Sequence, residues 1–183
     1  QQPGGMWFNP GLFSRLDRFE TLPRAAPAEP RSAVRPDIAR CGGEWPAALI
    51  PDEIEAGRLR ALVVMGANLI TALPAPERVA AALAAIDVLV VIDVVHNDTS
   101  DLATHVFASA GQLERPDVLS LEPNANVMYQ QYTEPAVPPR ADRPPMWQTL
   151  GRISAGIGLD ALGGGDDPLA LTPDAMFARL ARG

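Results

Sequence analysis

Ala61-Leu62-Val63-Val64-Met65 and Val88-Leu89-Val90-Val91-Ile92 are two continuous apolar runs, the first ended by Gly66 and the second by Asp93. Each run has the length of a β-strand. Apolar runs without alternation are typical of parallel strands, which are buried on both faces of their sheet. We therefore predict strands at 61–65 and 88–92, both buried on two faces.

The segment between these runs has the pattern of a helix. Pro76 stands where a helix tolerates proline, in its first turn. Val79, Leu83 and Ile86 recur at helical spacing within an alanine-rich stretch of high helix propensity. The order strand, helix, strand favours a parallel pair of strands.

Further elements extend this unit on both sides. Residues 51–56 have the pattern of a short helix stopped by Gly57. Asp98 or Thr99 can cap a helical turn that precedes a short strand at 105–108. The predicted core is therefore βαβαβ: an α/β fold of the doubly wound type, with a small three-layer parallel sheet, over residues 51–110.

The flanks of this core are rich in proline and in turn-forming residues. Residues 1–50 are predicted to form an extended, loop-rich segment that packs on the core, with one short helix near 12–18. Residues 111–183 are predicted to form a proline-rich connection, an amphipathic helix at 147–157 and a last helix capped by Thr172. We expect one domain in all.

The charge and the cysteine content argue against several classes of function. The formal net charge is −7, which argues against binding to nucleic acid or to anionic membranes, since both require clustered Lys and Arg. Cys41 is the single cysteine, so these residues form no internal disulfide. With His96 and His105 it gives too few and badly spaced ligands for a structural zinc or an iron–sulfur cluster. The sequence indicates neither a signal peptide nor a membrane span, and we expect a cytoplasmic protein.

The residues that follow the two apolar runs form the candidate site, because ligands of open parallel sheets bind outside the carboxyl ends of the strands. Gly66 would let backbone amides approach an anionic group, and the start of a following helix would add a favourable dipole. Asn68 can hydrogen-bond a sugar or a base. The alternative is that Gly66 only makes a turn and Asn68 only satisfies a loop.

Asp93 is the polar residue whose position most requires a partner, because a carboxylate at the end of an apolar strand is costly to bury without a donor. Guanine presents its N1–H and its exocyclic amine side by side, which match two carboxylate oxygens, so Asp93 can select guanine over adenine. The alternative is that Asp93 caps the turn His96-Asn97-Asp98-Thr99. We expect no catalytic residue and no metal ligand in the chain, and assign His96 and His105 to loop or core.

Five stretches occur in a recognisable order. Two of them are Ile54-Glu55-Ala56-Gly57-Arg58-Leu59-Arg60-Ala61-Leu62-Val63-Val64-Met65-Gly66-Ala67-Asn68 and, after it, Val90-Val91-Ile92-Asp93 with Asn97-Asp98-Thr99-Ser100. The other three are Pro3-Gly4-Gly5-Met6, Ala110-Gly111-Gln112-Leu113-Glu114, and Ala136-Val137-Pro138-Pro139 to Trp147 with Leu150. In this order they resemble a region of the molybdopterin oxidoreductases, the family of dimethyl sulfoxide reductase, formate dehydrogenase and nitrate reductase.

The resemblance implies an α/β region that helps to bind molybdopterin guanine dinucleotide, with the strand-end Asp and the following Thr at the guanosine. On that basis Gly66, Asn68, Asp93 and Thr99 would be cofactor contacts. The partners would be the remaining domains or subunits of the oxidoreductase, of which this chain would be a fragment.

The sequence also departs from the family's pattern. Leu69 stands where a proline is usual, Asn97 replaces the first threonine of the turn, and Thr104-His105 and Ala108 also differ. The family's molybdenum ligand and cluster cysteines lie upstream of the matched region, and Cys41 corresponds to neither. The chain is therefore expected not to be catalytic alone.

Two other interpretations stay open at this point. A non-enzymatic α/β scaffold that packs against a protein partner would also have proline-rich flanks. The central domain of thiamine-diphosphate enzymes shares the strand, helix, strand pattern. The turn from Asp93 to Thr99 favours the molybdopterin interpretation over the latter.

Overall fold

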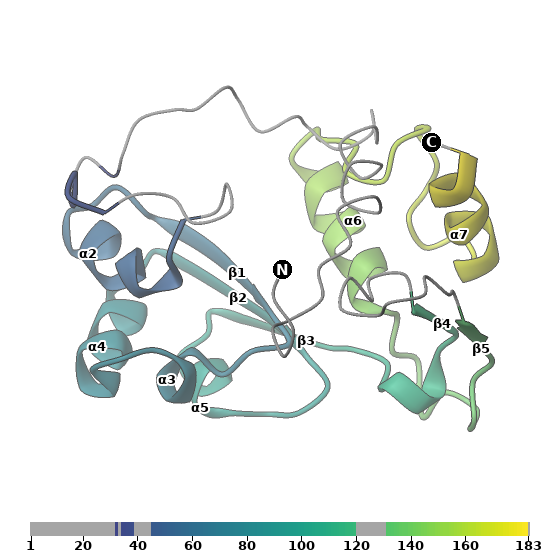
Figure 1. Ribbon diagram of the computed structural model, residues 1–183, viewed down its shortest axis with the longest axis horizontal. Helices are drawn as coiled ribbons and strands as arrows, with labels where there is room; N and C mark the ends of the chain where they lie inside the picture. The colour runs from purple at the N-terminus through teal and green to yellow at the C-terminus, as the bar shows by residue number, and fades with distance from the viewer. Residues whose placement is uncertain (1–31, 33, 39–44, 120–130, 183) are drawn as a thin grey trace, which may run out of the picture. The chain divides into compact units, whose positions relative to one another are not determined.

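The computed structural model describes residues 32, 34–38, 45–119 and 131–182, which are the coloured parts of Figure 1. The chain divides into two compact units, and the division falls between Ser109 and Ala110. Whether the two units make up one domain stays a prediction. The helix predicted near 12–18 and most of the segment 1–50 lie outside the described residues.

The first unit contains the parallel sheet. Its elements are η1 (Ala47–Leu49), α2 (Ile50–Glu55), β1 (Ala61–Met65), α3 (Leu69–Ala72), α4 (Pro76–Ala85), β2 (Val88–Asp93), α5 (Asp98–Asp101) and β3 (His105–Ala108). The strand order is β1-β2-β3, and both pairs are parallel, with Val64 opposite Val91 and Val91 opposite Val106. The predicted α/β class and the parallel sheet are confirmed.

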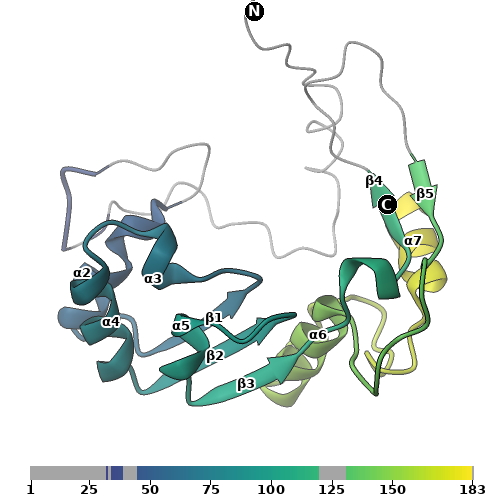
Figure 2. The same ribbon diagram turned by 90° about the horizontal axis from the view of Figure 1, so that it is seen from below.

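The core of this unit lies on one face of the sheet. Val64 of β1 and Leu89 and Val91 of β2 pack with Val79 and Leu83 of α4, and all five side chains are at most 5% exposed. Residues of α2 and α3 join the same cluster, and Figure 2 shows these helices beside the sheet. Burial of this aliphatic face is the main term that stabilises the unit.

Strand β1 differs from the prediction that it is buried on both faces. Val64 faces the core, but Val63 and Met65, on the other face, are 39% and 38% exposed. β1 is an edge strand, whereas β2 has a neighbour on each side and is buried from Leu89 to Ile92. The unbroken apolar run identified the strand correctly, but it did not distinguish an edge strand from a central one.

The second unit begins with η2 (Gln112–Glu114), β4 (Asp117–Leu119) and β5 (Gln131–Thr133), followed by α6 (Met146–Gly156) and α7 (Pro173–Arg182). β4 and β5 form an antiparallel pair that the sequence did not predict, because the proline-rich chain around it has the composition of a loop. Both predicted helices are confirmed. Thr172 caps α7 as predicted, since its Oγ accepts the N–H of Ala175 at 3.2 Å. Within the described residues, we find no helix that is both long and apolar enough to cross a membrane.

Candidate functional site

The carboxyl ends of β1 and β2 meet at one edge of the sheet. The backbone N–H of Gly66, directly after β1, donates a hydrogen bond to the carbonyl of Ile92 at 2.9 Å. Gly66 has a φ of 60°, in the left-handed region that glycine enters at little cost. The glycine therefore turns the chain away from the sheet as soon as the strand has ended.

Thr99 joins the loop after β1 to the loop after β2. Its side chain is fully buried, and its Oγ1 donates to Oδ1 of Asn68 at 3.0 Å and accepts the N–H of Leu69 at 2.8 Å. A hydroxyl has one proton to donate, and this one is used within the protein. Thr99 therefore has no free donor for the guanosine contact that the resemblance implies, and that contact stays a prediction. In this structure Thr99 contacts the candidate site through Asn68.

Asp93, half-buried at the end of β2, holds the loop that follows it. Its Oδ1 accepts the N–H groups of Val94 at 2.6 Å and Val95 at 3.2 Å, and its Oδ2 accepts Nδ2 of Asn97 at 3.0 Å. This is the loop-capping role of the alternative interpretation. A carboxylate offers about four acceptor positions, so Asp93 keeps roughly one, on Oδ2, for a further donor.

Asn97, not Asp98 or Thr99, is the N-cap of α5. Its Oδ1 accepts the N–H groups of Thr99 at 3.0 Å and Ser100 at 3.2 Å, and Ser100 Oγ accepts the N–H of Asn97 at 2.8 Å. The reciprocal bonds form a capping box. The predicted cap was wrong by one residue because three neighbouring side chains can each serve as a cap, and only one of them can occupy the position.

Asp98 is consequently free of the capping role, and the sequence did not single it out as a binding residue. It is exposed, and its Oδ2 accepts Nδ2 of Asn68 at 2.9 Å. No described residue donates a hydrogen bond to its Oδ1, which leaves about three acceptor positions on this carboxylate. Because Asn68 is fixed by Thr99, the orientation of the Asp98 carboxylate is fixed as well. Asn and Asp are about equally good N-caps, so the sequence alone could not decide that Asn97 takes the cap and leaves Asp98 outside it.

The edge is rich in acceptors, which determines the ligand groups that fit it. Asp93 and Asp98 are joined there by a third carboxylate, Asp101, whose Oδ1 lies 3.3 Å from Nδ1 of His96 on the surface. Phosphates would be repelled by these carboxylates, and the helix dipole expected after Gly66 is weak because α3 has only four residues. Acceptors of this kind suit ligand groups that donate N–H hydrogen bonds. The exposed side chains of Val94 and Val95 provide an apolar surface in the same loop.

The two histidines are predicted to lie in loop or core; His96 lies in a loop as predicted, whereas His105 is an exposed residue of strand β3. His96 is exposed in the loop, and His105 Nδ1 lies 3.0 Å from Oγ1 of Thr104 at the start of β3. Among the described residues there is no group of three or more His, Cys, Asp or Glu side chains that could hold a metal ion. Cys41 lies outside the described residues.

Comparison with known proteins finds no family model that matches the chain and no curated protein that matches it.

Proposed function

We propose that the first unit binds the guanine end of a cofactor at the carboxyl edge of its sheet. The cofactor proposed is molybdopterin guanine dinucleotide, and the chain would be part of a cytoplasmic molybdenum oxidoreductase completed by other domains or subunits. The observation that carries the proposal is the carboxylate of Asp98, which is exposed, oriented by Asn68 and open at Oδ1.

A carboxylate with an open oxygen discriminates between purines. Guanine offers N1–H and the exocyclic amine as adjacent donors, and two carboxylate oxygens can accept both at once. Adenine has an acceptor at N1, which a carboxylate repels. Asp98 has acceptor positions on both oxygens, so it fits this role better than Asp93, where one position is left.

The other predicted contacts take supporting roles in this proposal. Asn68 orients Asp98, Thr99 orients Asn68, and Gly66 keeps the loop close to the sheet without a side chain in the way. Asp93 shapes the loop from Val94 to Asn97 and can accept one further hydrogen bond. The cofactor would supply the oxidation–reduction chemistry, and the described residues would bind and orient its base.

Calorimetric titration of the chain with guanosine and adenosine diphosphates tests the proposal, because the two ligands have the same ribose, phosphates and charge. Good bidentate recognition of a base is worth about 1–3 kcal/mol of discrimination. We expect the guanosine ligand to bind roughly 5- to 150-fold more tightly. Equal affinities, or no binding of either nucleotide, would favour the scaffold instead.

One observation supports the scaffold as a second candidate. Met65 and Phe107 stand on the same face of the sheet, across from Ile92, and together with Val63 they expose apolar side chains at 38–41%. An exposed apolar face is typical of a surface that packs against another protein. Replacing Val63 and Phe107 by Thr would weaken such packing and leave nucleotide affinity unchanged, so the two functions can be tested separately.

A further inference from the structure

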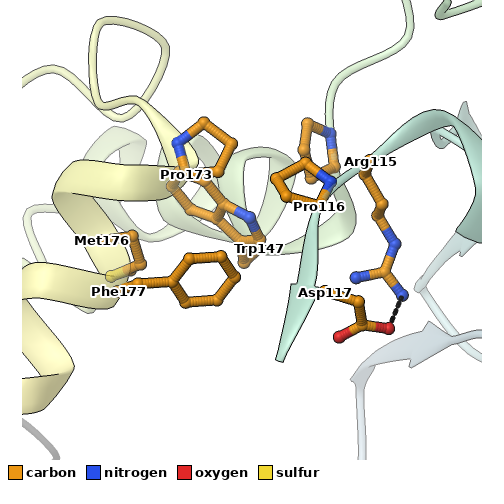
Figure 3. Close-up of a pocket in the computed structure, with 8 residues that line it drawn as sticks. Arg115, Pro116, Asp117, Trp147, Pro173, Met176 and Phe177 are labelled. Carbon is orange, nitrogen blue, oxygen red and sulfur yellow. Dashed lines mark ion pairs between the residues drawn. The ribbon is translucent and has the colours of Figure 1, made fainter. Parts of the chain in front are cut away.

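A cavity of about 180 Å³ lies in the second unit, lined by residues of β4, α6 and α7 and the chain beside them. Trp147, Met176, Phe177 and three proline rings form its apolar wall, and Arg115 and Asp117 form its charged side (Figure 3). None of these residues belongs to the candidate site on the parallel sheet. The cavity is therefore a second candidate ligand site, separate from the first.

The size and rigidity of the apolar wall fit a single aromatic ring. An apolar cavity of about 150 Å³ accommodates benzene. The ring of Phe177 also contacts Tyr132, whose ring meets it edge-on at a centroid distance of 6.0 Å and an interplanar angle of 89°. The hydroxyl of Tyr132 in turn donates to Oδ1 of Asp174 at 3.2 Å, and this hydrogen bond restrains the Tyr132 ring against Phe177.

The charged side of the cavity has one positive and one negative side chain. Nη2 of Arg115 lies 3.9 Å from Oδ2 of Asp117, a long distance for an ion pair, and the two side chains are 35% and 34% exposed. Asp117 Oδ2 also accepts Nε2 of Gln112 at 3.0 Å. A guanidinium has five donors, so the long contact to Asp117 leaves Arg115 able to bind a carboxylate.

A ligand with one charge would be attracted by one of these side chains and repelled by the other. A zwitterion satisfies both, because its carboxylate can face Arg115 while its ammonium faces Asp117. An α-amino acid bears the two charges on groups attached to the same carbon, next to each other like the charges of the pocket. The ring-sized apolar wall then calls for an aromatic side chain.

We propose that this cavity binds a free aromatic α-amino acid, with its ring against Trp147 and Phe177, its carboxylate on Arg115 and its ammonium near Asp117. The proposal is independent of guanine binding, which concerns the other unit.

Titration of the whole chain with L-phenylalanine and four analogues tests the proposal. 3-Phenylpropionate lacks the ammonium, 2-phenylethylamine lacks the carboxylate, leucine lacks the ring, and N-acetyl-phenylalaninamide lacks both charges and mimics a residue within a peptide. We expect phenylalanine to bind at least about tenfold more tightly than each of them, since each analogue loses a charged partner or the ring. No binding of phenylalanine, or affinities equal to those of the single-charge analogues, would overturn the proposal. Tighter binding of the neutral peptide mimic would also overturn it, in favour of a side chain of a partner protein.

Two variants test which charged group of the ligand faces Arg115 and which faces Asp117. Arg115→Gln should lower the affinity for phenylalanine about tenfold and should not weaken 2-phenylethylamine, which has no carboxylate. Asp117→Asn should likewise weaken phenylalanine and spare 3-phenylpropionate, which has no ammonium. Arg60→Gln, which removes an exposed ion pair with Asp87 in the first unit, is the matched control and should change nothing. Equal losses for all ligands in both variants, or no loss in either, would contradict the proposed orientation, and thermal unfolding verifies that each variant is folded.

Discussion

The hydroxyl of Thr99 donates a hydrogen bond to Oδ1 of Asn68 at 3.0 Å, and the amide of Asn68 donates to Oδ2 of Asp98 at 2.9 Å. A fully buried side chain thus fixes an exposed carboxylate through one intermediate residue. These two hydrogen bonds, the Thr99 relay, connect the loop after β1 with the loop after β2. The proposed site depends on both loops keeping this arrangement.

Thr99→Val should destabilise the chain by about 1–3 kcal/mol, because the valine has nearly the same shape but leaves the N–H of the buried Leu69 and Oδ1 of Asn68 without their partner. Urea unfolding measures the loss. The control is Thr71→Val, whose exposed hydroxyl donates to the carbonyl of Asn68 at 3.2 Å and should matter by less than about 0.5 kcal/mol. Equal stability of the two variants would mean that the Thr99 relay does not hold the loops.

The positions of the main strands and helices followed from local chemistry. Gly66 and Asp93 ended apolar runs, Pro76 began a helix and Thr172 capped one, and each of these signals acts within a few residues along the chain. The exposed face of β1 and the pairing of β4 with β5 depend on which segments meet in space. No pattern within either segment contains that information.

The candidate site was predictable only in part for the same reason. The residues after the strands were identified by the rule that ligands bind at carboxyl ends, but their individual roles depend on hydrogen bonds between residues about 30 positions apart. The hydroxyl proton of Thr99 is used in a hydrogen bond within the protein, and so are most of the acceptor positions of Asp93. Asp98 is left open because Asn97 takes the cap.

Glycine at position 151 of α6 should be required for packing. A Cβ there would lie 2.5 Å from Cδ1 of Leu162 and 3.0 Å from Cβ of Pro168. Gly151→Ala should destabilise by about 1–3 kcal/mol of overpacking, partly offset by a gain of about 0.5–1 kcal/mol in helix propensity. Gly156→Ala, in the same helix with no atom within 4 Å of the added Cβ, gains propensity alone and should not destabilise. A stabilising Gly151→Ala in thermal unfolding would show that the contact with Leu162 and Pro168 is loose.

Glu114 should make the stability of the second unit depend on pH. Its carboxylate accepts the N–H groups of Gly111 at 2.8 Å and Arg140 at 2.9 Å and pairs with Arg143 at 2.5 Å, and these contacts, the backbone donors first, lower its pKa below the ordinary 4.5. A lowered pKa in the folded state means that the unfolded state binds the proton more tightly. The contribution of Glu114 is therefore complete above the ordinary pKa and is lost as the pH falls through the lowered one.

Urea unfolding of the wild type and Glu114→Gln from neutral to acid pH measures this dependence. The wild type should be the more stable at neutral pH, and the difference should shrink as Glu114 becomes protonated. Glu134→Gln, an exposed position in the same unit, serves as the control. A difference between wild type and Glu114→Gln that stays constant down to acid pH would contradict the assignment.

The most direct test of the central claim is the ratio of affinities for guanosine and adenosine diphosphates, measured by calorimetry in the wild type, Asp98→Asn and Asp93→Asn. Asparagine at 98 can still accept the hydrogen bond from Asn68, but it places an amide donor against the donors of guanine. We predict a wild-type preference for guanosine diphosphate that disappears in Asp98→Asn, with the affinity for adenosine diphosphate and the free energy of unfolding unchanged. Asp93→Asn should also bind guanosine diphosphate more weakly, and should lose stability because the loop from Val94 to Asn97 loses an acceptor. A wild type without preference, or an Asp98→Asn variant that keeps it, would contradict guanine recognition at this edge of the sheet.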